Sequence, residues 1–126
     1  GELELGDQII KGAVNGLTTD PVYLDVHMDA NLEITVPIKD GHTALVYVYE
    51  GDINIADTER ALHKTELAIL GKDGDVFVRS NTASRFLLLA GKPIGEPIAQ
   101  YGPFVMNSPQ EIEQAIQDYR DGVLTQ

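Results

Sequence analysis

Near its C-terminus the chain reads GKPIGEPIAQYGPFVMN, from Gly91 to Asn107. Its three prolines and three glycines exclude both a helix interior and a strand interior. The stretch also contains Ile, Tyr, Phe, Val and Met side chains, which a solvated linker lacks. We therefore expect an ordered, extended crossing segment that lies against an apolar surface, either the outside of a β-barrel or a neighbouring domain.

A helix is predicted immediately after this segment, over residues 108–121. Ser108 provides an N-cap, Pro109 suits the first helical position, and Glu111 completes a capping box. Gly122 is placed to end the helix. The apolar positions follow at helical spacing and form a stripe that must pack on something: Ile112, Ala115, Ile116 and Tyr119.

Upstream of residue 91 the pattern is typical of short β-strands. Residues 22–28 alternate apolar and polar side chains, and residues 44–50 are apolar on both faces, as in a central strand. Further strands are predicted at residues 8–14, 32–38, 53–56, 68–70, 76–78 and 86–89, with Gly- and Asp-rich turns between them. Residues 1–7 are interpreted as a lead-in or linker. These signals predict one all-β domain over residues 1–126, a sandwich or barrel.

Composition and charge limit the possible partners. The chain has 126 residues, no cysteine, and a formal net charge of −11 from 20 acidic and 9 basic residues. Such an acidic surface argues against direct nucleic-acid binding and against binding to anionic membranes. The absence of cysteine and of a long apolar run favours a cytoplasmic protein, or a nuclear one if the source is a eukaryote.

The motifs around the opening stretch resemble those of the pirin family. They are Gly-x-Pro-Ile-x-Glu-Pro-Ile, then Tyr-Gly-Pro-Phe-Val-Met-Asn, then the helix reading Glu-Ile-x-x-Ala-Ile-x-Asp-Tyr, between Leu87 and Gly122. Pirins are bicupins, so the resemblance implies a cupin-like double-stranded β-helix, or jelly-roll barrel, with a C-terminal helix packed outside. It also implies iron in an N-terminal cupin, quercetin 2,3-dioxygenase activity, and transcriptional co-regulation in eukaryotes.

The residues of this chain depart from the cupin metal pattern. A cupin metal site uses a His-x-His pair, a later glutamate and a histidine on a later strand. The glutamate position falls on Ala44, seven residues before Gly51, and neither residues 36–40 nor residues 75–79 contain histidine. We therefore expect a metal-free domain without cofactor or activity of its own, which positions an N-terminal cupin or self-associates through the same surface. As a module for another protein partner, it would expose an apolar patch.

Two sets of residues are candidates for a site. Asp25, His27 and Glu33 form the alternative hypothesis, an independent cupin that holds a metal or small molecule with two carboxylates and one imidazole. His42 and His63 are expected to be solvated loop residues. Structural or interface roles are expected for Glu96, Tyr101, Phe104 and Met106 in the crossing segment.

Overall fold

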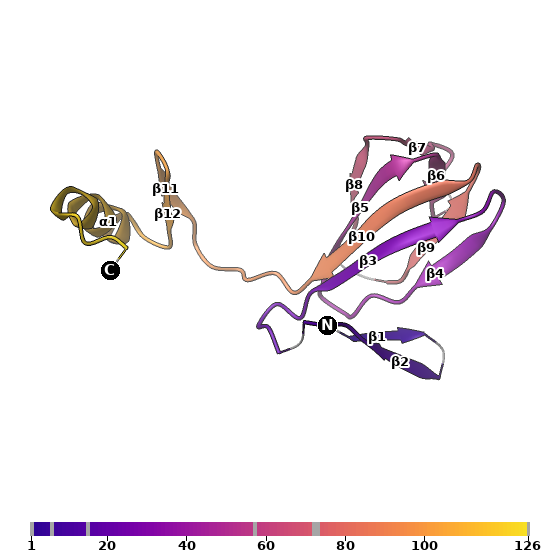
Figure 1. The fold of residues 1–126 in the computed structure, drawn as a ribbon, viewed down its shortest axis with the longest axis horizontal. Coiled ribbons are helices and arrows are strands. Elements are labelled where there is room, and N and C mark those ends of the chain that lie inside the picture. Colours follow the sequence, from indigo (N-terminus) through magenta and orange to yellow (C-terminus); the bar gives the residue numbers. More distant parts are fainter. Residues whose placement is uncertain (1, 6, 15, 57, 72–73, 126) are drawn as a thin grey trace. The chain divides into compact units, whose positions relative to one another are not determined.

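The computed structural model describes residues 2–5, 7–14, 16–56, 58–71 and 74–125 (Figure 1). The chain divides into two compact units, residues 1–93 and 94–126, where the sequence predicts a single module. Among the described residues, the only helix is too short and too polar to cross a membrane.

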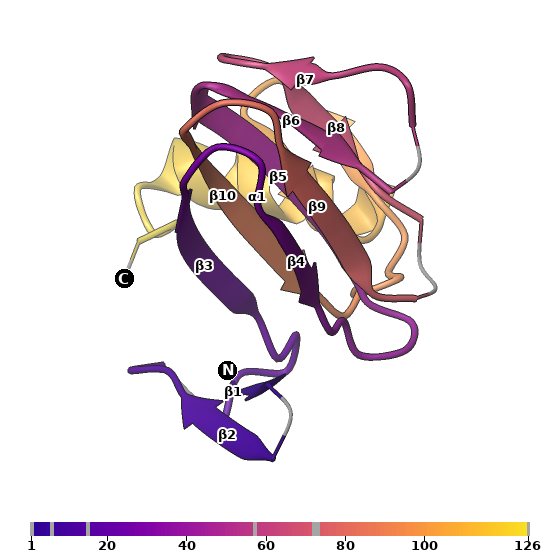
Figure 2. The same ribbon diagram turned by 90° about the vertical axis from the view of Figure 1, so that its right-hand side faces the viewer.

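The first unit is built from two antiparallel four-stranded sheets, which face each other in Figure 2. One sheet has the order β3 (Val22–Met28), β10 (Ser84–Gly91), β5 (Thr43–Glu50) and β8 (Leu67–Ile69). The other has the order β4 (Glu33–Val36), β9 (Val76–Ser80), β6 (Asp52–Ile55) and β7 (Leu62–His63). The predicted all-β, cupin-like fold is therefore confirmed, and β5 is an interior strand as expected.

The core lies between the two sheets and consists of the inward-facing side chains of their strands. Alternation places every second residue of a strand in this layer, so the buried positions follow the two-residue period. The strand residues buried there are Met28, Val36, Ala44, Val46, Val48, Ile53, Val76, Val78, Phe86, Leu88 and Ala90.

Gly51 forms the corner between the two sheets, at the turn from β5 to β6. Its φ is +74°, and a Cβ at this position would lie 2.4 Å from the carbonyl oxygen of Ala83. Only glycine combines that backbone conformation with so close an approach. The corner joins β5 of one sheet directly to β6 of the other.

A short hairpin precedes the two sheets, where the sequence predicts a lead-in over residues 1–7. Strand β1 (Glu2–Leu5) pairs antiparallel with β2 (Gln8–Lys11), and Glu2 and Lys11 form an ion pair of 3.2 Å. The alternation of Glu and Leu in residues 2–5 is a weak strand pattern that the acidic composition obscures. Leu3 of this hairpin is buried in the core.

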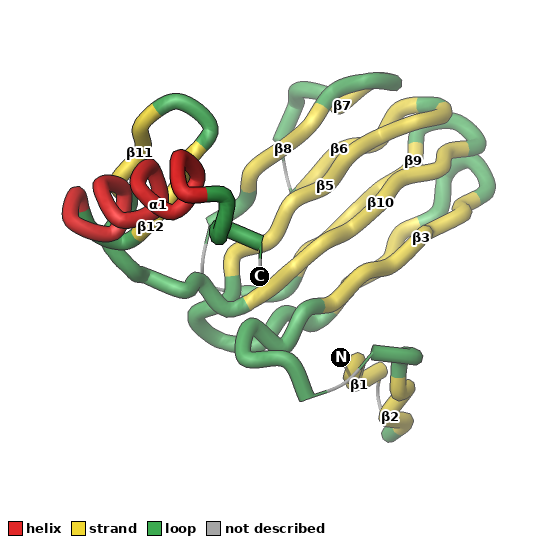
Figure 3. Tube along the Cα trace, turned by 60° about the vertical axis from the view of Figure 1, so that its left-hand side comes forward, coloured by secondary structure: helices red, strands yellow, loops and turns green. Residues whose placement is uncertain are grey.

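The second unit contains a hairpin and the helix, both visible in Figure 3. Strands β11 (Ala99–Tyr101) and β12 (Phe104–Met106) pair antiparallel. The expectation that residues 91–107 contain no strand is therefore wrong for these two strands and for Gly91, the last residue of β10. Gly102, with φ of +55°, and Pro103 form the two-residue turn, so the residues taken as strand breakers make the hairpin possible.

The predicted helix is present as α1 (Pro109–Asp121). The Oγ atom of Ser108 accepts a hydrogen bond from the backbone N–H of Glu111 at 3.3 Å and donates to the Glu111 carboxylate at 2.8 Å. Gly122 closes the helix with φ of +73°. Within this unit Ile112 and Ala115 are buried, and the rings of Phe104 and Tyr119 pack edge to face at 6.3 Å.

Candidate functional site

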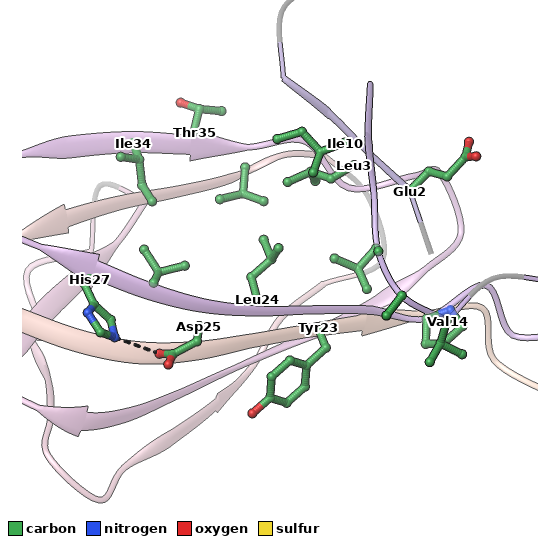
Figure 4. Close-up of a pocket in the computed structure, with 16 residues that line it drawn as sticks. Glu2, Leu3, Ile10, Val14, Tyr23, Leu24, Asp25, His27, Ile34 and Thr35 are labelled. Carbon is green, nitrogen blue, oxygen red and sulfur yellow. Dashed lines mark ion pairs between the residues drawn. The ribbon is translucent and has the colours of Figure 1, made fainter. Parts of the chain in front are cut away.

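A cavity of about 1100 Å³ lies where the two sheets separate, between the edge strands β3 and β4 (Figure 4). Leu24 of β3 and Ile34 of β4 point into it from the two sides. Val22, Val26 and Val36 continue this inward-facing apolar lining, and Leu3 and Ile10 of the hairpin add to it. The carboxylates and imidazole among its lining residues are those of Glu2, Asp25 and His27; no described lining residue is lysine or arginine.

A smaller cavity of about 150 Å³ adjoins the large one and shares Glu2, Leu3 and Val22 with it. His42 lines the small cavity and is 6% exposed, so the expectation of a solvated loop histidine is wrong. The Nδ1 atom of His42 is buried without a hydrogen-bond partner among the described residues. Its sequence position, one residue after a turn glycine, gives no signal of this burial.

The outer face of β3 carries a small polar cluster. The Tyr49 hydroxyl donates to Asp25 Oδ1 at 2.6 Å and lies 3.1 Å from His27 Nε2. His27 Nε2 and Asp25 Oδ1 are 3.4 Å apart. The hydrogen bond from Tyr49, with a smaller one from His27, lowers the pKa of Asp25 below its ordinary value, and the same Tyr49–Asp25 bond raises the pKa of Tyr49.

Glu33, the third member of the alternative metal site, does not join this cluster. Asp25 and His27 face outward from the sheet that contains β3, as Figure 4 shows for Asp25. In β4, Ile34 and Val36 face the core, so Glu33 projects from the outer face of the other sheet. Within the described part of the chain, no group of three or more His, Asp or Glu side chains is arranged to hold a metal ion.

The rest of this outer face is apolar across all four strands. Strand register aligns one row of Tyr23, Leu89, Leu45 and Ile69, and a second row of Leu87, Tyr47 and Leu67 next to Asp25. Ile69 is 73% exposed, Tyr23 64% and Leu67 52%, while the other four are half-buried. We call these seven residues the apolar face.

The outer face of the second sheet differs in composition. Outward-facing positions there carry charged, amide, hydroxyl and imidazole groups with one apolar ring, Phe77. These residues are Glu33, Thr35, Asp52, Asn54, His63, Phe77 and Arg79, of which Asn54 is buried, with hydrogen bonds to Thr58 and Asn81. This face needs no partner to cover it.

The remaining predicted residues all lie in the second unit. The Glu96 carboxylate accepts a hydrogen bond of 2.7 Å from the Asn107 side-chain amide. Phe104 and Met106 are half-buried, and Phe104 contacts Tyr119, whereas Tyr101 is exposed. Ile94 and Ile98 are also exposed, so this unit presents apolar side chains of its own.

The chain is similar to proteins of one family along most of its length. The model of the pirin C-terminal cupin domain matches residues 23–125. A Pseudomonas aeruginosa protein named as a putative quercetin 2,3-dioxygenase is 50% identical over 115 residues, which are 90% of this chain and 40% of that protein. Human pirin is 38% identical over 107 residues, covering 82% of this chain and 37% of pirin.

Solved structures give the same result. A crystal structure of quercetin 2,3-dioxygenase from Acinetobacter baumannii matches 97% of this chain and 41% of its own, with a TM-score of 0.79 and 36% identity. A second structure of that name from the same organism matches with a TM-score of 0.66 at 16% identity, which supports the fold alone. The chain thus spans about two fifths of the length of these relatives.

Proposed function

The chain belongs to the pirin family through its C-terminal cupin domain, and from this membership we propose that it is the metal-free partner of an iron-binding N-terminal cupin. In this role it covers and positions the half that carries the chemistry. The dioxygenase activity in the names of its relatives would then require both cupins. The apolar face is the observation that carries this proposal.

The apolar face has the character of an interface. Isolated exposed apolar residues are ordinary on protein surfaces, but a contiguous patch of large ones marks a surface for a partner. Here four large side chains form one row across all four strands of the sheet, and a second row lies beside it. A second cupin domain offers a surface broad enough to cover both rows, while water would leave them unfavourably exposed.

The interior of the sandwich supports the assignment of iron binding to the other cupin. The position of the cupin glutamate is held by Ala44, which is buried and faces the core from β5. The neighbouring inward positions of β5 are Val46 and Val48, which offer no ligand atoms to iron. Metal chemistry therefore belongs to the other cupin in this proposal.

The polar cluster suits the edge of such an interface. Asp25, His27 and Tyr49 lie beside the apolar rows, together with an ion pair of 3.5 Å between Arg85 and Glu50. Polar groups at an interface rim fix register and orientation more than they add affinity.

The test is reconstitution from two chains. The N-terminal cupin of the Pseudomonas aeruginosa relative, produced alone with iron, is titrated with this chain by calorimetry, and dioxygenase turnover is followed. We expect association and a gain in activity, and Leu89→Asp should weaken binding by roughly a hundredfold because a carboxylate would be buried without a partner.

Thr35→Asp is the matched control, since it adds the same charge to the polar outer face and should leave binding unchanged. Metal content is measured on this chain alone. If Thr35→Asp weakens binding and Leu89→Asp does not, the interface lies on the sheet of β4, β9, β6 and β7, and the proposal is refuted. Stoichiometric iron in this chain would refute the metal-free role.

A further inference from the structure

We propose that the cavity between β3 and β4 is a binding site for an uncharged, mainly apolar small molecule, whose polar group reaches His42. The apolar lining of this site faces the inside of the sandwich, opposite to the apolar face, and only Tyr23 of the apolar face borders the cavity. The site would give the domain a ligand of its own without a metal. Three observations carry the inference.

The first observation is the shape and lining of the cavity. It is a hollow between two sheets with the hairpin beside it, and its volume of about 1100 Å³ is at the upper end for small-molecule sites. Leu24 and Ile34 point into it from opposite sides, so a ligand body would contact apolar side chains on both sides. In most of the sandwich the same inward positions are closely packed.

The second observation is the charge around the cavity, which selects against anions. Among the described residues that line the large cavity, the carboxylates are those of Glu2 and Asp25, of which Asp25 points to the outer face of the sheet, and neither lysine nor arginine is present. The described lining of the small cavity includes one lysine, Lys39, which is paired with the Asp20 carboxylate. Lys11 is paired with Glu2, and Asp25 is engaged by Tyr49. An anionic ligand would therefore lose its hydration and would have to compete with Asp20 for Lys39, the one lysine or arginine in the described lining of the two cavities.

The third observation is His42, which lines the adjoining cavity and whose Nδ1 atom is buried without a hydrogen-bond partner among the described residues. A buried polar atom without a hydrogen bond is costly, and native proteins provide a partner for nearly all such atoms. The two cavities share Leu3 and Val22, so a ligand that extends from the large cavity into the small one would bring a hydroxyl or carbonyl group toward His42. The ligand class is therefore a neutral apolar molecule with at least one hydroxyl or carbonyl group.

The probes are three molecules with one ring system: 2-naphthol, naphthalene and 2-naphthoate. Each is titrated at neutral pH into the chain labelled on Ile, Leu and Val methyl groups. We expect 2-naphthol to saturate one site and to shift the methyl signals of Leu24 and Ile34, while those of Leu89 and Ile69 stay in place. Naphthoate should bind at least about tenfold more weakly because its charge is not compensated. Shifts confined to the apolar face would overturn the proposal.

Two Ile→Phe substitutions provide matched variants. Ile34→Phe fills the cavity and should abolish 2-naphthol binding, whereas Ile69→Phe on the apolar face should leave it unchanged. The reverse pattern would overturn the site. Titrations at two protein concentrations test a second copy as the occupant: cavity signals that move on concentrating the protein, with loss of probe binding, would refute a small-molecule site.

His42→Leu tests the polar contact. The affinity for 2-naphthol should fall about five- to tenfold, as expected for one net hydrogen bond, while the affinity for naphthalene stays the same. Equal changes for both probes would show that His42 acts only through packing and would refute its assignment as the ligand contact. The wild-type methyl shifts test the cavity itself without any variant.

Discussion

The two outer faces of the sandwich differ although both sheets have four strands and share one core. The face of β3, β10, β5 and β8 carries two apolar rows, and the face of β4, β9, β6 and β7 carries charged and polar groups. The inward faces of both sheets are mainly apolar, so packing of the shared core does not account for the difference. In the proposed function, the N-terminal cupin covers the first of these faces and the second faces water.

Neighbouring residues of one strand make this comparison testable. Leu88 points into the core and is fully buried, and Leu89 points outward into the apolar face. We expect Leu88→Ala to lower the free energy of unfolding by about 3–5 kcal/mol, because it removes packed methyl groups and leaves a cavity. Leu89→Ala should cost less than about 1 kcal/mol in the chain alone, since part of its side chain is already solvated.

Urea denaturation of the two variants measures this difference. With the N-terminal cupin of the relative present, the loss in binding free energy should be larger for Leu89→Ala than for Leu88→Ala. Equal costs in the isolated chain would mean that the outward face is as tightly packed as the core. The two faces of β10 would then contribute equally to the stability of the isolated chain.

Gly51 tests how the two sheets are joined. Gly51→Ala should destabilise the chain by about 2–4 kcal/mol, because it combines a left-handed backbone with a Cβ only 2.4 Å from the Ala83 oxygen. Gly41→Ala is the control, since Gly41 has a similar φ of +76° with no atom near its Cβ position. That variant should lose only about 1–2 kcal/mol, measured by the same denaturation. Equal losses would show that the corner relaxes without strain on either sheet.

Local sequence signals predicted the parts of the fold that local chemistry determines. The alternation of apolar and polar residues predicts both ends of β3, and the capping box of Ser108 and Glu111 predicts the start of α1. The sequence pattern does not predict the hairpin of β11 and β12, because glycine and proline usually interrupt strands, whereas Gly102 and Pro103 form a tight turn between two of them.

The candidate site was harder to predict because it depends on which strands become neighbours. Asp25 and His27 share a face by their spacing, but Tyr49 reaches them across β10, from a strand more than 20 residues away. The same strand order separates Glu33 from them by placing β4 in the other sheet. The apolar rows likewise exist only once four strands are aligned, and the burial of His42 depends on distant residues.

The smallest expected effect concerns the polar cluster at the edge of the apolar face. Tyr49→Phe removes the hydrogen bond that lowers the pKa of Asp25 from its ordinary value of 3.8, so the pKa of Asp25 should rise. The pKa of Asp25 is lower in the folded state than in the unfolded state. The interaction therefore stabilises the fold at pH values above the unfolded-state pKa, and this stabilisation is lost as the pH falls through the folded-state pKa. The stability difference between wild type and Tyr49→Phe should therefore be present at pH 6 and shrink in strong acid.

Tyr47→Phe is the control for this prediction, since Tyr47 lies on the same outer face and strand and has no such bond to Asp25. Carboxyl NMR titration of Asp25 measures the pKa directly, and thermal unfolding at both pH values measures its consequence. The exposed position of the cluster keeps the effect on stability small, because water screens it. A pKa of Asp25 that does not change in Tyr49→Phe would mean that His27 alone holds the carboxylate. The polar edge of the face would then depend on residues of β3 rather than on contact across the sheet.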